Sequence, residues 1–163
     1  SHRAVAAISG GAASVAFTFV AYDYSTCHPM RKMYGYDIGG AFTRLHNIVA
    51  RSFPAIIPSM TLSDLSRFDG SSPRRPLYFA SEGFVWDASS SDMFKSSYSQ
   101  WSGKDATVCL AKMSLDPADI NRTDWESLTD TDKESLLSWT NYFSEKYLIK
   151  ARLKEYSEWC QGK

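Results

Sequence analysis

The sequence has 163 residues, of which 44% are hydrophobic and 22% charged, and its formal net charge is zero. This length suits one domain with an appendage rather than two full domains. The balanced charge argues against a nucleic-acid partner, because no basic field would attract phosphates. Residues 1–58 carry five basic against two acidic residues, and the remainder carries 13 against 16. This asymmetry suits an arm that meets a membrane or an acidic partner, or a solvated linker.

The first predicted element is a transmembrane helix within residues 1–23. Residues 4–22 contain no charged side chain, and a helix of that length spans about 28 Å, close to the hydrocarbon core of a bilayer. Small residues such as Gly10 and Ser14 would let it pack closely on another helix. A signal region and a buried soluble helix are the alternatives. Because the chain begins at Ser1 without Met, we expect that any presequence has already been removed.

Residues 24–59 are predicted to connect this helix to the domain. Apolar side chains recur there at helical spacing and predict an amphipathic helix that ends near Pro54. They are Ile38, Phe42, Leu45, Ile48, Val49 and Phe53. Such a helix could lie on a membrane, pack on a partner or pack on its own domain.

The domain is predicted over residues 60–158, where short helical and extended patterns alternate. The expected elements are a helix capped by Thr61 and Asp64, strands over residues 76–79 and 84–86 joined tightly at Glu82-Gly83, a helix over residues 105–113, a longer helix capped by Thr129 or Asp130, and a strand or tail over residues 148–153. This order is typical of a small α+β domain.

Several blocks of this region resemble the cytochrome b5-like heme/steroid-binding domain, in the branch called the membrane-associated progesterone receptor family. The blocks are TLSDLSRFDG with PLYFASEGFVWD within residues 61–87, YSQWSGKDATVCLAK over residues 98–112, and WTNYFSEKY over residues 139–147. The segment SLDPADI, residues 114–120, looks most like the secreted members called neudesins. The resemblance implies a b5-like fold.

The same resemblance raises the question of heme. All three histidines, His2, His28 and His46, precede the domain, so a bis-histidine centre within it is excluded. Family members that bind heme use a tyrosinate ligand. The resemblance implies Tyr98 for that role, with Lys146 and Tyr147 beside the heme.

Two departures from the family pattern argue against heme. Phe94 occupies the position expected for a second loop tyrosine. Residues 95–97 shorten a turn that should border the porphyrin. We therefore expect no cofactor, with heme b held by Tyr98 as the alternative.

Other chemistry finds little support in the sequence. Cys27, Cys109 and Cys160 fit neither a disulfide framework nor a zinc site, and a pair between the first and the last stays open. Cys109 lies in an apolar run and is expected to be buried. The acidic run of residues 124–134 lacks the spacing of a calcium loop, so no metal site is expected. No histidine lies in the domain to activate a nucleophile, so we expect no enzyme activity.

The functional hypothesis is therefore a membrane-anchored, b5-like domain that acts as a non-catalytic accessory or scaffold subunit of a larger membrane complex. Its expected partners are other subunits and membrane lipids, without nucleic acid. A respiratory complex of the mitochondrial inner membrane is a possible setting, suggested by the apparently processed start. The alternatives are a tyrosine-ligated heme-binding regulator and a steroid- or lipid-binding module.

Overall fold

The computed structural model describes residues 38–72 and 74–156. They fall into two units, one ending at Ile56 and the other beginning at Ile57. The transmembrane helix predicted within residues 1–23 lies outside the described residues. Within the described ranges, no helix combines the length and the apolar character needed to cross a membrane.

The first unit contains the predicted amphipathic helix as α2, Ile38–Ser52. Phe42, Leu45 and Val49 return at helical spacing along one side of it. The helix ends just before Pro54, as expected where a proline disfavours the helical conformation of the preceding residue. A short 3-10 turn, η1 (Pro54–Ile56), follows.

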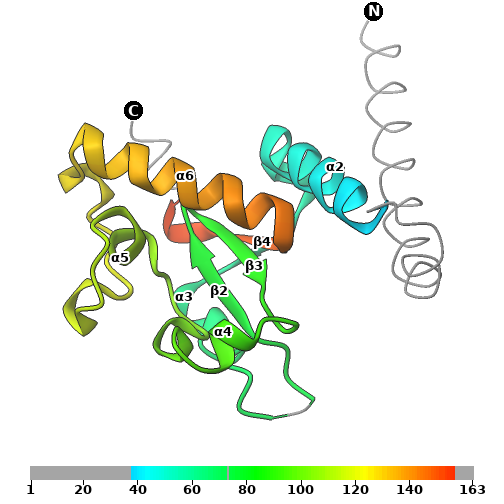
Figure 1. Cartoon of the computed structure of the whole chain (residues 1–163), viewed down its shortest axis with the longest axis horizontal. Coiled ribbons are helices and arrows are strands. Elements are labelled where there is room, and N and C mark those ends of the chain that lie inside the picture. The colour runs from blue at the N-terminus through cyan, green and yellow to red at the C-terminus, as the bar shows by residue number, and fades with distance from the viewer. Residues whose placement is uncertain (1–37, 73, 157–163) are drawn as a thin grey trace, which may run out of the picture. The chain divides into compact units, whose positions relative to one another are not determined.

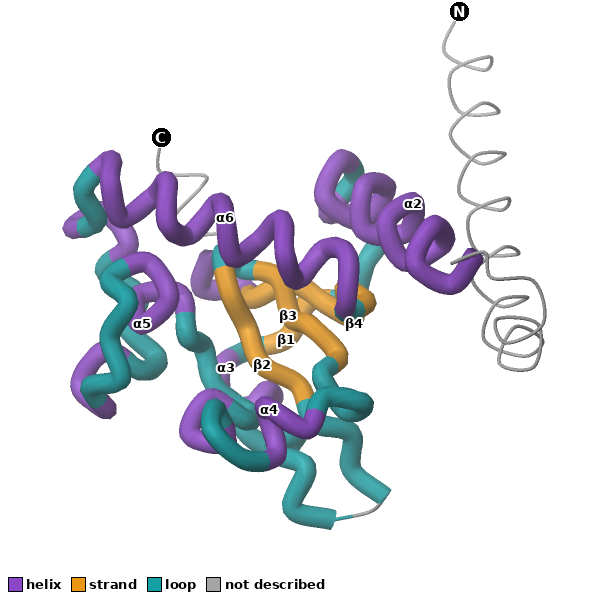
Figure 2. The backbone as a smooth tube through the Cα atoms, in the orientation of Figure 1, coloured by secondary structure: helices purple, strands orange, loops and turns teal. Residues whose placement is uncertain are grey.

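The second unit is built on a four-stranded sheet with the strand order β1-β4-β3-β2 (Figures 1 and 2). Its strands are β1 (Ser59–Met60), β2 (Tyr78–Ser81), β3 (Phe84–Asp87) and β4 (Leu148–Leu153). β3 pairs antiparallel with both β2 and β4, whereas β1 runs parallel to β4. The three predicted strands are present, although β2 begins and ends two residues later than the predicted span of residues 76–79. β1 was not predicted, because two residues carry no alternating pattern.

A tight hairpin turn joins β2 to β3 at the predicted position. Glu82 and Gly83 both have positive φ, 53° and 75°, and Ser81 pairs with Phe84 on either side of them. Two central residues with positive φ match the right-handed twist of paired strands. The turn therefore fixes the register that places Phe79 opposite Trp86.

The helices connect and cover this sheet. They are α3 (Leu62–Leu65), α4 (Asp92–Lys95), α5 (Thr107–Ala111) and α6 (Asp130–Lys146), with 3-10 turns η2 (Ser99–Trp101), η3 (Pro117–Asp119) and η4 (Trp125–Ser127). Capping boxes open α3 and α6, formed by Thr61 with Asp64 and by Thr129 with Asp132. α5 is shorter than the predicted span of residues 105–113. Its N-cap is Ala106, and Met113 has a positive φ of 53°, which an α-helix does not contain.

The two faces of the sheet carry different cores. One face is aliphatic and small, formed by Leu65, Ala80, Val85, Ala151 and Leu153. The other face is aromatic: Phe79 and Trp86 pair across β2 and β3 and contact Phe143 of α6, with ring centroids 4.9 and 6.0 Å away. Together these contacts yield the α+β fold expected from the sequence.

Candidate functional site

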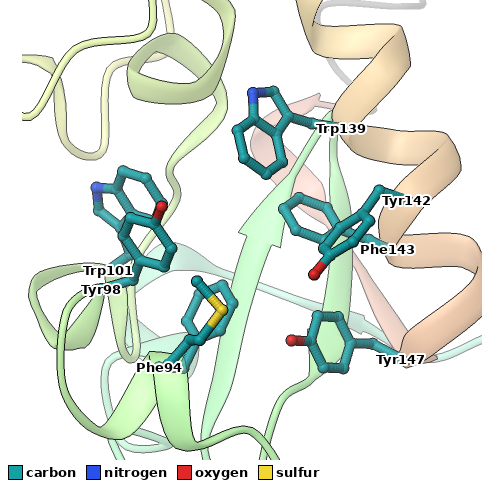
Figure 3. A pocket seen from close by; sticks show the side chains of 8 residues that line it. Phe94, Tyr98, Trp101, Trp139, Tyr142, Phe143 and Tyr147 are labelled. Carbon is teal, nitrogen blue, oxygen red and sulfur yellow. The ribbon is translucent and has the colours of Figure 1, made fainter.

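An aromatic pocket of about 250 Å³ opens on the second face of the sheet. Seven aromatic rings and one methionine line it, with no charged side chain among them: Met93, Phe94, Tyr98, Trp101, Trp139, Tyr142, Phe143 and Tyr147. Figure 3 shows two walls facing each other, one formed by α6 and the other by the segment from α4 to Trp101.

The α6 wall follows from residue spacing. Trp139, Phe143 and Tyr147 follow at intervals of four residues, and Tyr142 comes three residues after Trp139, so the four share one side of the helix end. Phe143 is 2% exposed and anchors this wall. It stacks on Trp139, with centroids 5.7 Å apart, and meets Phe79 edge to face.

The opposite wall is a stacked pair of rings. Tyr98 lies parallel to Trp101, with 4.7 Å between centroids and 4° between ring planes. The chain after Trp101 is hydrogen-bonded along the edge of β2, from the Gly103 amide to the Tyr78 carbonyl at 2.7 Å and from the Ala80 amide to the Lys104 carbonyl at 2.9 Å. These backbone bonds hold the wall in a fixed position relative to the sheet.

Phe94 forms the floor between the walls. Its ring stacks on Phe79 at 4.1 Å and is 3% exposed. It belongs to α4, a helix that was not predicted, because four residues are too few to show periodicity. Lys95 is the last residue of that helix, so the turn expected over residues 95–97 is helical at its start.

Two phenols at the C-terminal end of α6, those of Tyr142 and Tyr147, make hydrogen bonds beside the pocket. The Tyr147 hydroxyl donates to Ser91 Oγ at 3.0 Å. Lys146 Nζ donates to the Tyr142 hydroxyl at 2.6 Å and lies 4.3 Å from the centre of that ring. This bond raises the pKa of Lys146. Of the three site residues named from the sequence, Tyr98 and Tyr147 line the pocket, and Lys146 reaches it only through Tyr142.

Asp105 lies buried beneath the second wall. Its carboxylate accepts from the Thr107 hydroxyl at 2.5 Å, and its amide donates to the Asn121 side-chain oxygen at 2.8 Å. Burial raises the pKa of Asp105 to about 7, although hydrogen bonds from Thr107 and Trp125 favour the ionised form. Through these hydrogen bonds, Asp105 connects the loop that follows Trp101 to α5 and to the segment that follows α5.

Cys109 is buried as predicted, at 1% exposure, and burial raises the pKa of its thiol to about 11. Such a thiol is almost wholly protonated at neutral pH and is a poor nucleophile. Cys27 and Cys160 lie outside the described residues.

The residues of this pocket do not fit a heme. A porphyrin, with its four pyrrole rings and their substituents, is much larger than this cavity of about 250 Å³. Tyr98 is stacked on Trp101, and Phe94 supplies no second phenol. A free metal ion is a separate question from heme. Among the described residues, no three histidine, cysteine, aspartate or glutamate side chains are grouped so that they could hold one.

Sequence reasoning named only part of this lining. Trp101, Trp139, Tyr142 and Phe143 lie in the blocks that carry the family resemblance, but the sequence assigned none of them a binding role, and Met93 lies outside those blocks. The spacing of Trp139, Phe143 and Tyr147 was the signal available, because residues four apart on a helix share a face.

No protein-family model matches the chain. It is 33% identical over 96 residues to the "Probable steroid-binding protein 3" of Arabidopsis thaliana, a match that covers 57% of this chain and 95% of that protein. It is 34% identical over 105 residues to "Membrane steroid-binding protein 2" of Oryza sativa subsp. japonica, covering 63% of this chain and 39% of that protein. The chain thus spans about two fifths of the rice protein's length.

Two solved structures are also similar, one of a protein from Arabidopsis thaliana and one of a protein from Arabidopsis. One belongs to a hypothetical protein described as having a cytochrome b5 like fold, with a TM-score of 0.54, 31% identity, and coverage of 60% of this chain and 91% of that one. The other is the solution structure of a putative steroid-binding protein, with a TM-score of 0.52, 29% identity, and coverage of 58% and 95%.

Proposed function

This chain belongs to the family of cytochrome b5-like steroid-binding proteins, and from that premise we propose that its aromatic pocket binds a flat, apolar ligand of the steroid class. The observation that supports this most directly is the lining: seven aromatic rings surround about 250 Å³ without a charged side chain. Fused rings can lie between the α6 wall and the stacked Tyr98 and Trp101.

The expected affinity is moderate. Burying about 200 Å² of apolar ligand surface contributes roughly 5 kcal/mol, and aromatic contacts add to it. Lost rigid-body freedom offsets part of this gain. The cavity volume leaves one end of the ligand in solvent. With the aromatic contacts and the lost rigid-body freedom roughly cancelling, we expect a dissociation constant on the order of 100 µM.

Isothermal titration of the purified chain with pregnenolone tests the proposal. Trp139→Ala should weaken binding about tenfold, because it removes one of the large rings of the α6 wall. Leu137→Ala is the matched control, since this side chain lies on the same helix, is 49% exposed and does not line the pocket. Absence of binding, or equal binding by the Trp139 variant, would refute the pocket as the site.

We propose further that the role is non-catalytic. The pocket holds no histidine, cysteine or carboxylate that could act as a general base or nucleophile. The names of the similar proteins describe binding alone. The ligand is incubated with the chain and then analysed by chromatography. Conversion of the ligand into another compound would contradict a non-catalytic role.

Membrane anchoring through residues 4–22 is proposed from their uncharged length, and similar rice and Arabidopsis proteins are named as membrane proteins. Alkaline carbonate should leave the full chain in the membrane pellet, and release into the supernatant would contradict the anchor.

The accessory role in a larger membrane complex stays a prediction, as does its mitochondrial inner-membrane setting. It depends on the small residues of that segment and the amphipathic α2. Deleting residues 1–58 should abolish co-purification with partner subunits. Normal assembly of the shortened chain would place the contacts in the b5-like domain instead.

A further inference from the structure

We infer that the pocket selects amphipathic ligands that carry an anionic oxygen group, a sulfate or a carboxylate, which Lys146 and Tyr142 bind at the edge of the pocket. This deepens the proposed function and depends on it, because it names the chemical class of the ligand. The observation behind it is the pair formed by these two side chains on α6.

The pair presents hydrogen-bond donors toward the pocket. A lysine ammonium has three donors and no acceptor, so the 2.6 Å contact makes the Tyr142 oxygen the acceptor. The Tyr142 proton must then point elsewhere and can be donated to a ligand. Lys146 keeps two further N–H donors. Several donors beside one positive charge match the oxygens of a sulfate or carboxylate.

Among the residues that the structure describes, no carboxylate lies within ion-pair distance of Lys146. Lys95, Lys133 and Lys150 each lie within ion-pair distance of an aspartate, at 3.9, 3.1 and 3.5 Å. Within the described ranges, no such ion pair involves Lys146, and the charge interactions that raise its pKa come from Tyr142 and Tyr147. Glu145 precedes it by one position and so projects about 100° around the helix.

Tyr142 couples this cation to the pocket. The phenol lines the cavity and is 38% exposed, so its ring covers apolar ligand surface while its oxygen holds the ammonium at the edge. Of the other two phenols in the lining, Tyr147 already donates its proton to Ser91, and Tyr98 is stacked on Trp101 in the opposite wall. The pocket therefore has one apolar end between the rings and one end that donates hydrogen bonds and carries positive charge.

The test compares pregnenolone with pregnenolone sulfate on the purified full chain by isothermal titration. The two ligands share the ring system and differ in charge at one end. The sulfate should bind about five- to tenfold more tightly, a range set by a partly exposed ion pair supported by hydrogen bonds. This advantage should shrink as salt is raised from about 50 to about 500 mM, because exposed charges are screened.

Lys146→Met should remove the advantage of the sulfate and leave pregnenolone affinity within about twofold, and Tyr142→Phe should reduce it while keeping the ring. Lys133→Met, on the same helix but paired with Asp130, is the matched control and should retain the full advantage. Equal binding of the two ligands, or an advantage that survives Lys146→Met, would overturn the inference alone. Failure of both ligands to bind would overturn the proposed function with it.

Discussion

The position of Tyr98 in the structure differs from the role that the resemblance implied for it. The resemblance assigned it to iron, yet here its ring lies parallel to Trp101 and forms one wall of the pocket. Phe94, which packs on Phe79, cannot donate a phenolic hydrogen bond to orient a tyrosinate. At the residue scale, these positions suit stacking on an apolar ligand better than ligation of a metal.

The chain purified without added heme is accordingly expected to show no Soret band. Titration with hemin should give no stoichiometric ferric spectrum, because the cavity of about 250 Å³ does not fit a porphyrin. The measurement is the absorption spectrum between about 350 and 450 nm, the range that contains the Soret band of heme proteins. A one-to-one spectrum that disappears on Tyr98→Phe would contradict this expectation and restore Tyr98 as the ligand.

Asp105 predicts a pH dependence of folding stability. Burial raises its pKa from the ordinary value of 3.8 to about 7, so between these values the folded protein retains a proton that the unfolded chain has lost. Stability should therefore fall as the pH rises from about 4 to about 7, and level off above. The raised pKa corresponds to a loss on the order of 4 kcal/mol.

Urea unfolding of the chain and of Asp105→Asn at pH values of about 4.5, 5.5, 6.5 and 7.5 measures this effect. The difference between the two free energies of unfolding should change steadily across that range, since only one variant titrates at residue 105. The histidines are common to both proteins and cancel in the comparison. A difference that stays constant with pH would show that Asp105 is ionised throughout.

At the scale of elements, the β2–β3 hairpin aligns the aromatic face that carries the pocket. Its turn needs positive φ at Gly83, and a Cβ built there would overlap the ring of Tyr156. Both constraints operate at one backbone position. The turn therefore joins the strands and also provides space for the chain that follows β4.

Gly83→Ala is expected to lower the free energy of unfolding by at least about 2 kcal/mol, from left-handed backbone strain and from the overlap. Urea denaturation provides the measurement. In the Tyr156→Gly background, which also removes the Cβ that would lie 2.6 Å away, the penalty should drop to the strain alone, about 1 kcal/mol. If the penalty were the same in both backgrounds, the overlap would be relieved elsewhere.

Elements with local signals were predictable, and those defined by distant partners were not. Thr61 and Asp64 predicted the start of α3, because a capping box lies within four consecutive residues. Glu82-Gly83 likewise predicted the hairpin turn. β1 exists only because it pairs with β4, and α4 only because Phe94 packs on Phe79. The pocket is likewise a product of tertiary packing, which local patterns do not encode.

At the scale of the whole molecule, the boundary between the two units falls just before β1. Ser59 and Met60 pair with Arg152 and Leu153, and the Arg152 amide donates to the Pro58 carbonyl at 2.9 Å. Met60 also packs on the aliphatic core. The residues that end the predicted connector thus supply an edge strand of the domain.

This boundary predicts different behaviour for two shortened chains. A fragment of residues 57–163 should fold cooperatively, because it keeps all four strands of the sheet that the structure describes. A fragment of residues 61–163 keeps the Thr61 cap but loses β1, its hydrogen bonds to β4 and the contact of Met60. Each lost hydrogen bond costs about 1 kcal/mol and the methionine contact about 1 kcal/mol more, so the shorter fragment should be less stable by about 2–3 kcal/mol.

Urea unfolding followed by tryptophan fluorescence compares the two fragments, and the full chain is the reference. Equal stability of the two fragments would mean that β1 contributes nothing to the sheet, and failure of residues 57–163 to fold would mean that the first unit is needed for folding of the b5-like domain.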